Sequence, residues 1–286
     1  MGYREYLITQ GINIYEAEQI AWYKYNHALI PISLIDLNIH INKGSVKDLL
    51  NKSKALFLRW SNDPSVTESQ WWMIQCKFYD KNNLSKKVRY GIRRGKEYCY
   101  VKSISSQHLA INGFSCYQNS FARYKGAKPL NRDLFEAYYC SASEGFGFEY
   151  WGVFSLNNDL IGYMQCIREE KGICTSVIKY DPNGLNLYSS YALLDSILDY
   201  YLNNQGVIVS NGSRSIYHDT NIQNYLLKFG FEKIYCHLNV EYSPLVKIIV
   251  NSLYPFRNKL SKLPPISLFP KINSVLIQEQ YRRSCN

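Results

Sequence analysis

The stretch from residue 150 to residue 242 carries the most constraining pattern, an ordered series of β-rich runs and amphipathic helical segments. Asn157-Asn158 separates the first two runs as in a β-hairpin, and Asp181-Pro182-Asn183-Gly184 ends the third run with a strong turn signal. Such a series predicts a mixed sheet with helices packed against it. In chain order, we expect strands at 150–156, 159–167, 172–180, 206–210 and 231–242, and helices at 187–202 and 220–229.

The first half has a similar mixture of elements. A chain of 286 residues, with 46% hydrophobic and 20% charged residues, is long and apolar enough for two globular domains. The sequence predicts the α/β (α+β) class, with two domains that are each a mixed, mostly antiparallel sheet flanked by helices. We expect strands at 30–41, 55–60, 71–79 and 98–104, helices at 84–95, 106–127 and 132–143, and a division into 1–128, 129–244 and a basic tail at 245–286.

The cysteines and the ends of the chain indicate a compartment. Met1-Gly2-Tyr3-Arg4 lacks the apolar run of a secretory signal, and no stretch reaches the roughly 18 apolar residues of a membrane span. The eight cysteines are scattered and form no C-x-x-C pair. Reduced, buried thiols in the cytoplasm are therefore favoured over disulfides or a metal site, and no metal cofactor is expected.

The net charge of +10 is concentrated in two patches, the first between Lys77 and Lys102, with nine basic and two acidic residues. An apolar residue recurs there every four positions, as in a helix, and Gly95 is expected to stop that helix. The basic residues are expected on the opposite side of the helix, as a solvated face or as a platform for the phosphates of a nucleotide, a tRNA or a lipid headgroup. The apolar positions are Leu84, Val88 and Ile92, and the basic ones are Lys86, Arg89, Arg93 and Lys96.

The second patch runs from Lys247 to Arg283, with seven basic residues against Glu279. It begins with a nearly continuous apolar run over 245–253, which Pro255 breaks. This run fits a core helix or an interfacial helix on an anionic membrane. Core packing is favoured, because the run has no strongly charged face of its own.

The order of elements after residue 150 resembles the C-terminal core of the GNAT acyltransferase superfamily. The residues that carry the resemblance are Leu160-Ile161-Gly162-Tyr163 on the second hairpin strand and Leu226-Leu227-Lys228-Phe229-Gly230-Phe231 at the end of the later helix. In the first half, the helix over 84–95 and the short β run after it look like the corresponding part of bacterial Fem-type peptidyltransferases. Those proteins carry two GNAT-like domains in tandem and move an amino acid from aminoacyl-tRNA to a cell-wall precursor.

Two positions depart from the pattern of coenzyme A-dependent GNAT enzymes. Those enzymes usually carry Gln/Arg-x-x-Gly-x-Gly/Ala after the third core strand, where helix N–H groups hold the pyrophosphate. Here Tyr180 is followed by a stretch with one glycine, and Asp181 stands where an anion would dock. Fem-type proteins also tend to lack the glycine-rich loop. Leu226 stands at the position where many GNAT proteins carry a general-acid tyrosine, and Tyr225 lies one residue away.

Acyl transfer to an amine requires a base, donors for the developing oxyanion and an acid for the leaving group. In the GNAT core, the segment that corresponds to 210–221 borders the acyl and acceptor cleft. His218 is the candidate base, because it titrates near neutrality, and Arg214 is the candidate group for an anionic donor. Tyr225 completes the predicted catalytic set. Thr220 and Asn221 are predicted to bind substrate, although helix capping is the commoner role for both residue types.

Further substrate contacts are predicted in the first half. The basic helix contributes Arg89, Arg93 and Arg94, and an acceptor groove is expected to include Trp60 and Trp71. Trp72, Ile74, Cys76 and Phe78 alternate as one face of a strand, for which core packing is favoured; this leaves Trp71 freer on the other face.

The resemblance implies an N-acyltransferase that moves an acyl group from acetyl-CoA or another acyl-CoA to an amine of an amino sugar, amino acid or surface-polymer precursor. An aminoacyl-tRNA-dependent transferase is the alternative among enzymes, with tRNA as a partner. The alternative outside enzymes is a non-catalytic GNAT-like module that binds nucleic acid or membrane. The expected location is the cytoplasm, and peripheral contact of the tail with the inner face of the membrane is left open.

Overall fold

The computed structural model describes residues 1–36, 38–64, 68–123, 128–216, 221–260 and 269–285. The chain forms two compact units, each assembled from separate stretches of sequence. These units do not follow the consecutive segments expected from the sequence, because the chain passes from one unit to the other several times. Unit 1 is Met1–Tyr6, Gln75–Gly212 and Ile222–Glu232, and unit 2 is Leu7–Ile74, Ser213–Asn221 and Lys233–Asn286.

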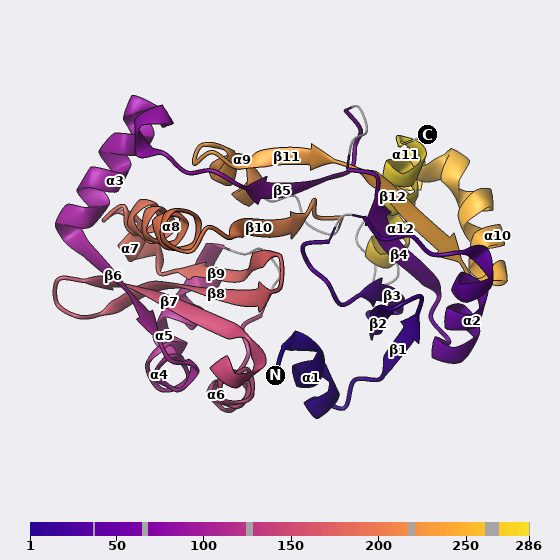
Figure 1. Cartoon of the computed structure of the whole chain (residues 1–286), viewed down its shortest axis with the longest axis horizontal. Helices are drawn as coiled ribbons and strands as arrows, with labels where there is room; N and C mark the ends of the chain where they lie inside the picture. The colour runs from indigo at the N-terminus through magenta and orange to yellow at the C-terminus, as the bar shows by residue number, and fades with distance from the viewer. Residues whose placement is uncertain (37, 65–67, 124–127, 217–220, 261–268, 286) are drawn as a thin grey trace. The chain divides into compact units, whose positions relative to one another are not determined.

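A seven-stranded mixed sheet has the order β11-β5-β10-β9-β8-β7-β6 (Figure 1). Strands β6 to β9 form an antiparallel series, and β10 pairs with β9 in parallel. The predicted hairpin at Asn157-Asn158 joins β7 to β8, as expected. The strands are β5 (Trp72–Cys76), β6 (Cys99–Ile104), β7 (Phe148–Ser155), β8 (Leu160–Glu169), β9 (Gly172–Tyr180), β10 (Ile208–Ser213) and β11 (Glu232–Tyr235).

Helices pack on this sheet, and two of them approach each other closely at glycines. A β-carbon added at Gly95 would lie 2.7 Å from the carbonyl oxygen of Tyr188, and one at Gly91 would lie 2.5 Å from the Tyr191 ring. Helix α3 continues to Tyr98, so the expected stop at Gly95 is wrong; this glycine permits close helix packing instead. The helices are α1 (Tyr3–Thr9), α3 (Lys86–Tyr98), α4 (Ser106–Asn112), α5 (Phe114–Ser120), α6 (Arg132–Ser141), α7 (Pro182–Leu185), α8 (Ser189–Leu198) and α9 (Ile222–Leu227), with a π-helical turn at Asp199–Asn204 and 3₁₀ turns at Lys81–Asn83, Phe121–Arg123 and Glu144–Phe146.

Unit 2 is built on a five-stranded mixed sheet of order β1-β2-β3-β4-β12. Its core contains Trp22, Leu29 and Leu58 in one cluster, and Phe57, Trp71 and Val240 in another. The strands are β1 (Ile14–Ala17), β2 (Ile20–Tyr25), β3 (Ala28–Pro31), β4 (Phe57–Asn62) and β12 (His237–Tyr242), and the helices are α2 (Lys43–Ser53), α10 (Pro244–Leu253), α11 (Arg257–Leu260) and α12 (Phe269–Arg283), with a 3₁₀ turn at Tyr254–Phe256. The two mixed sheets and their helices confirm the predicted fold class.

The run at 231–242 was expected to be one strand, and this expectation is wrong. It divides at Cys236 into β11 and β12, which belong to different sheets. Strand β12 pairs antiparallel with β4, from His237 opposite Asn62 to Tyr242 opposite Phe57. The division follows from pairing between distant strands, which a continuous apolar run does not encode.

The apolar run of the second basic patch forms helix α10, but it does not pack as a core helix. Val250 is 3% exposed, whereas Leu245 is 75%, Ile248 is 65% and Ile249 is 55% exposed. The prediction of core packing is therefore wrong for most of this run. In the part of the chain that the structure describes, no helix is both long and apolar enough to span a bilayer.

Candidate functional site

A basic groove lies along the exposed face of α3. Ser85 caps this helix and accepts a hydrogen bond from the Val88 N–H at 3.4 Å. The groove has a volume of about 390 Å³ and is lined by Lys86, Arg89, Tyr90 and Arg93. Arg93 lies 5.4 Å from the centre of the Tyr90 ring. Clustered cations beside an aromatic ring suit the phosphates and bases of a nucleic acid.

Basic residues of this helix also have protein partners: Arg89 donates to the Asn82 carbonyl at 3.2 Å and Arg93 lies 3.8 Å from Glu97. Lys96, which was expected on the exposed face with Arg93, is 50% exposed, and its ammonium also pairs with Asp195 of α8, with 2.7 Å between Nζ and Oδ2. Arg94 contacts Glu97 and the Tyr98 hydroxyl and covers the Tyr98 ring at 4.4 Å. The basic groove therefore contains fewer basic residues than the sequence pattern suggested.

The turn after β9 is occupied by an aspartate side chain. Asp181 caps α7, and its Oδ1 accepts a hydrogen bond from the Asn183 N–H at 2.8 Å. Its Oδ2 accepts another from Asn119 Nδ2 at 2.6 Å. A bound pyrophosphate needs free N–H groups and positive charge. At this turn the Asn183 N–H already donates to the negatively charged Asp181 side chain, which disfavours pyrophosphate binding.

The segment predicted to carry catalysis is described in part. His218 and Thr220 lie outside the described residues, and Asn221 is exposed just before α9. Arg214 lies between two aromatic rings, 4.3 Å from the Trp72 ring centre and 4.4 Å from that of Tyr281. These contacts brace the loop after β10; anion binding by Arg214 and the roles of His218, Thr220 and Asn221 stay predictions.

Tyr225 lies on α9 in unit 1. Its ring packs against Phe229, with 5.2 Å between ring centres, and against Tyr191 at 5.6 Å. Burial raises the pKa of the Tyr225 hydroxyl above its usual value, so the group stays protonated at neutral pH. The raised pKa makes the phenol a weaker acid and its oxygen is buried, so the role of Tyr225 as the general acid stays a prediction.

Of the two tryptophans predicted to line an acceptor groove, Trp71 is a core residue, whereas Trp60 is mostly buried but lines the pocket of unit 2 described below. Trp71 is 2% exposed and donates from its indole N–H to the Ser61 hydroxyl at 2.9 Å. Trp60 is 8% exposed and packs edge-on against Trp22. The expectation that Trp71 is the freer residue is wrong, because Trp72 is the partly exposed one and Arg214 and Lys233 cover its ring. Phe78, expected in the core, is exposed.

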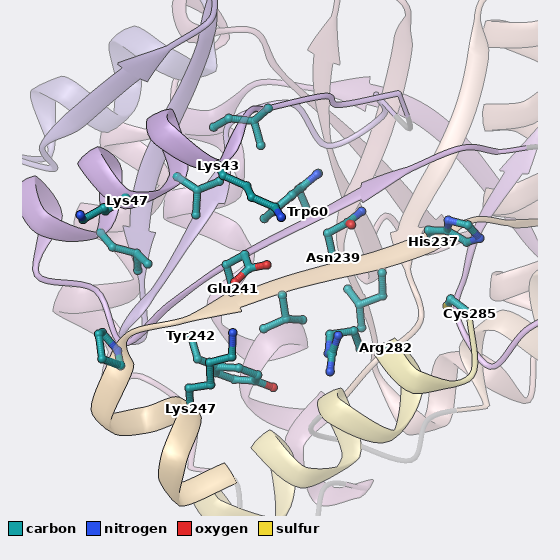
Figure 2. Close-up of a pocket in the computed structure, with 16 residues that line it drawn as sticks. Lys43, Lys47, Trp60, His237, Asn239, Glu241, Tyr242, Lys247, Arg282 and Cys285 are labelled. Carbon is teal, nitrogen blue, oxygen red and sulfur yellow. The ribbon is translucent and has the colours of Figure 1, made fainter. Parts of the chain in front are cut away.

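A pocket in unit 2 is lined by residues from segments far apart in the sequence (Figure 2). Its volume is about 610 Å³. His237, Asn239 and Glu241 follow one another on one face of β12. The surrounding helices supply four basic side chains, from Lys43 and Lys47 on α2, Lys247 on α10 and Arg282 on α12. Among the described residues, the three lysines make no ion pair, so the pocket favours an anionic ligand.

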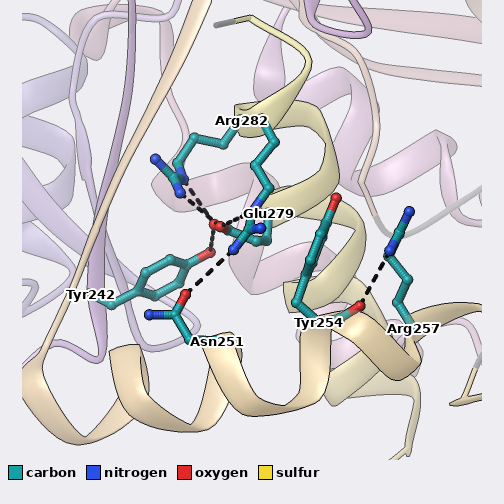
Figure 3. Close-up of polar contacts among 7 residues, drawn as sticks. Tyr242, Asn251, Tyr254, Arg257, Glu279 and Arg282 are labelled. Carbon is teal, nitrogen blue, oxygen red and sulfur yellow. Dashed lines mark hydrogen bonds and ion pairs between the residues drawn. The ribbon is translucent and has the colours of Figure 1, made fainter.

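We call this pocket the anion pocket. Arg282, one of its lining residues, is held by the buried carboxylate of Glu279 (Figure 3). The Glu279 side chain is 1% exposed and pairs with Arg282 and Arg283, each at 2.7 Å. Tyr242 donates its hydroxyl to the same carboxylate at 3.1 Å. Burial alone would raise the pKa of Glu279, but the hydrogen bonds from both arginines outweigh burial and hold it below its usual value. Lys43 and Lys247, which both line the pocket, are more than 190 residues apart in the sequence, and no local motif marks the pocket.

Most of the cysteines are buried in the structure. Six cysteines are buried, Cys140 is exposed and Cys285 is half-buried, all as free thiols. Burial raises the pKa of Cys76 to about 11, which keeps it protonated and a poor nucleophile. The described residues contain no group of three or more histidine, cysteine or acidic side chains arranged to hold a metal.

No protein-family model matches the chain, and no curated protein matches it in sequence. Solved structures match in fold. The C-terminal DUF2156 domain of a protein from Agrobacterium fabrum, provisionally named a lysylphosphatidylglycerol synthetase, superposes with a TM-score of 0.57 at 10% identity, covering 87% of this chain and 90% of that one. FemX superposes with a TM-score of 0.57 at 10% identity, covering 86% and 92%.

L-PGS from Bacillus licheniformis superposes with a TM-score of 0.54 at 9% identity, covering 99% of this chain and 93% of that one. At such identities the similarity concerns the fold. It agrees with the resemblance found in the sequence. The chain has a GNAT-like fold related to that of Fem-type transferases.

Proposed function

We propose that this protein is a Fem-like transferase that takes its acyl group from an aminoacyl-tRNA and moves it to an amine on an anionic acceptor. The observation that carries the choice of donor is Asp181, whose carboxylate occupies the turn where coenzyme A-dependent relatives hold pyrophosphate. The basic groove of α3, in the same unit, offers cations for an RNA backbone. The acyl-CoA donor suggested first by the sequence is therefore the less favoured one.

The fold supports a transferase. The matching structures include FemX, L-PGS and a domain of a protein named for lysylphosphatidylglycerol synthesis. The sequence resemblance is to peptidyltransferases that use aminoacyl-tRNA. The anion pocket of unit 2 is our candidate site for the acceptor, because its lysines suit a phosphate or carboxylate on a surface-polymer precursor or a lipid headgroup.

The chemistry assigns one task to each of two predicted residues, His218 and Tyr225. The acceptor amine attacks the ester carbonyl, a C–N bond forms, and the C–O bond to the terminal ribose of the tRNA breaks. His218 takes the proton from the ammonium group, and Tyr225 donates a proton to the departing ribose oxygen. The products are an amide and a free tRNA.

Direct binding measurements test the donor. We expect bulk aminoacyl-tRNA to bind with an affinity that falls steeply with salt, with a slope of about 0.7 to 0.9 per phosphate contact. The double variant Arg89→Ala/Arg93→Ala should reduce that slope by about two and weaken binding at least tenfold. The control Lys52→Ala/Lys228→Ala removes the same charge from exposed positions outside the basic groove and should bind as the wild type does.

Thermal unfolding with acetyl-CoA is the second arm. A ligand at about 100 times its dissociation constant stabilises a protein by roughly 2.7 kcal/mol, so a true donor shifts the midpoint by several degrees. We expect no shift with acetyl-CoA. A clear shift with acetyl-CoA, together with tRNA binding that is unchanged in Arg89→Ala/Arg93→Ala, would identify acyl-CoA and not aminoacyl-tRNA as the donor. Tight tRNA binding without transfer to any amine would favour a non-catalytic binding module.

A further inference from the structure

Helix α10 presents aliphatic side chains to the outside of unit 2. Leu245, Ile248 and Ile249 are 75%, 65% and 55% exposed, and Phe256, in the turn that follows, is 55% exposed. We call these four residues the apolar strip. Val250 anchors the helix to the core at 3% exposure. Since large aliphatic side chains rarely gather on a surface without a partner, the strip marks a contact site.

The sequence around the strip carries positive charge only. Between Glu241 and Glu279 there is no acidic residue, whereas five basic residues occur in the same interval. Two of them, Lys259 and Lys271, are exposed in the structure and lie outside the anion pocket, which Lys247 lines. An apolar strip that is flanked by cations and free of acids complements an anionic and apolar partner, which is the description of an acidic phospholipid surface.

A groove beside the strip is also apolar. It has a volume of about 620 Å³ and opens between α10 and α12. Ile249 belongs to both the strip and the groove wall, so the two surfaces are continuous. The wall consists mainly of Val246, Ile249, Val250, Leu253, Val275 and Leu276. Aliphatic walls with few polar groups fit a hydrocarbon chain better than a base or a peptide backbone.

We propose that α10 is a membrane-docking helix that lies in the headgroup region of an anionic bilayer, with the apolar strip inserted and the neighbouring lysines on the lipid phosphates. A helix of ten residues is too short to span the bilayer, and lying in the interface requires no span. This inference does not depend on the proposed transferase activity, since it concerns where the protein is held and not what it transfers.

Vesicle co-sedimentation of the full chain tests the proposal. We expect binding to phosphatidylcholine vesicles that contain about 30% phosphatidylglycerol, and at least tenfold weaker binding to pure phosphatidylcholine. Raising the salt concentration should also weaken binding, because exposed charges are screened. The triple variant Leu245→Ser/Ile248→Ser/Ile249→Ser should lose at least tenfold in affinity. The control Ile111→Ser/Leu134→Ser/Leu156→Ser changes equally exposed residues of unit 1 and should bind normally.

Charge and self-association have separate readouts. The variant Lys259→Glu/Lys271→Glu should weaken binding to the anionic vesicles by more than tenfold, since each basic residue near the surface contributes about fivefold. Absence of binding to anionic vesicles would overturn the proposal, as would a triple variant that binds like the wild type. A concentration-dependent dimer in light scattering, lost in the triple variant while vesicles have no effect, would assign the strip to a second copy instead. Loss of tRNA binding in Arg89→Ala/Arg93→Ala with unchanged vesicle binding would separate this inference from the proposed function.

Discussion

Lys96 and Asp195 form an ion pair between α3 and α8, with 2.7 Å between Nζ and Oδ2 and an aspartate side chain that is 1% exposed. Tyr79 donates its hydroxyl to Oδ1 of the same carboxylate at 2.6 Å, and the Lys81 ammonium lies 3.5 Å away. A buried carboxylate with three partners holds the basic helix on the body of unit 1. Lys96 therefore has a structural part, distinct from the exposed Arg89 and Arg93.

Replacement of Asp195 by Asn should destabilise unit 1. It removes the charge that the two lysines face and weakens the Tyr79 hydrogen bond, and we expect a loss of about 2–3 kcal/mol in the free energy of unfolding. Urea unfolding monitored by tryptophan fluorescence measures this loss. Lys87→Ala, on the exposed side of α3, is the control and should change stability by less than about 0.5 kcal/mol. Equal stability of both variants would show that the carboxylate is not a structural anchor.

Gly95→Ala should also be destabilising, although alanine favours helices by about 1 kcal/mol over glycine. The added β-carbon would lie 2.7 Å from the backbone oxygen of Tyr188 and 3.0 Å from Cβ of Ala192. Backbone cannot yield as a flexible side chain does, and overpacking costs about 1–3 kcal/mol. The thermal midpoint should fall. Gly145→Ala, with nothing nearer than 3.8 Å, should leave it unchanged, and a stabilised Gly95→Ala protein would contradict the close packing of α3 on α8.

Glu279 predicts how stability depends on pH. Because its pKa is lower in the folded than in the unfolded state, its contribution is complete above the unfolded value, near 4.5, and is lost as the pH falls through the folded value. At pH 7, Glu279→Gln should cost about 2 kcal/mol. The gap in unfolding free energy between wild type and variant should shrink below about pH 5. A gap of the same size at pH 7 and pH 4 would mean that the charge of Glu279 contributes nothing.

His218→Ala tests the candidate base from the sequence. We expect aminoacyl transfer to fall at least 100-fold, the usual contribution of general base catalysis, with tRNA affinity unchanged. Single-turnover transfer and filter binding measure the two quantities separately. His40→Ala, at an exposed histidine that contacts Asn38, is the matched control and should keep full activity. Full activity of His218→Ala would remove His218 from the mechanism.

Local patterns predicted the elements whose signals are contained in a few residues. The capped helix α3, the hairpin between β7 and β8 and the turn at Asp181 each depend on neighbours in sequence, and the structure has all three. The GNAT-like fold could be predicted for the same reason, since it was expected from the order and spacing of such elements. The position of Asp181 at the turn speaks against a pyrophosphate site in the sequence alone, and the structure adds that its side chain caps α7.

Pairing and burial between distant segments were decided by tertiary structure. Residues 231–242 read as one strand, yet the chain divides them between two sheets because β12 finds its partner in β4, far away in sequence. Lys43 and Lys247 line one pocket although no local pattern relates them. The apolar residues of α10 look like core in the sequence, and only the surrounding fold leaves them exposed. The amino-acid sequence of a segment determines whether it favours a helix, a strand or a turn. The segments that pack against it in space decide which of its faces is buried.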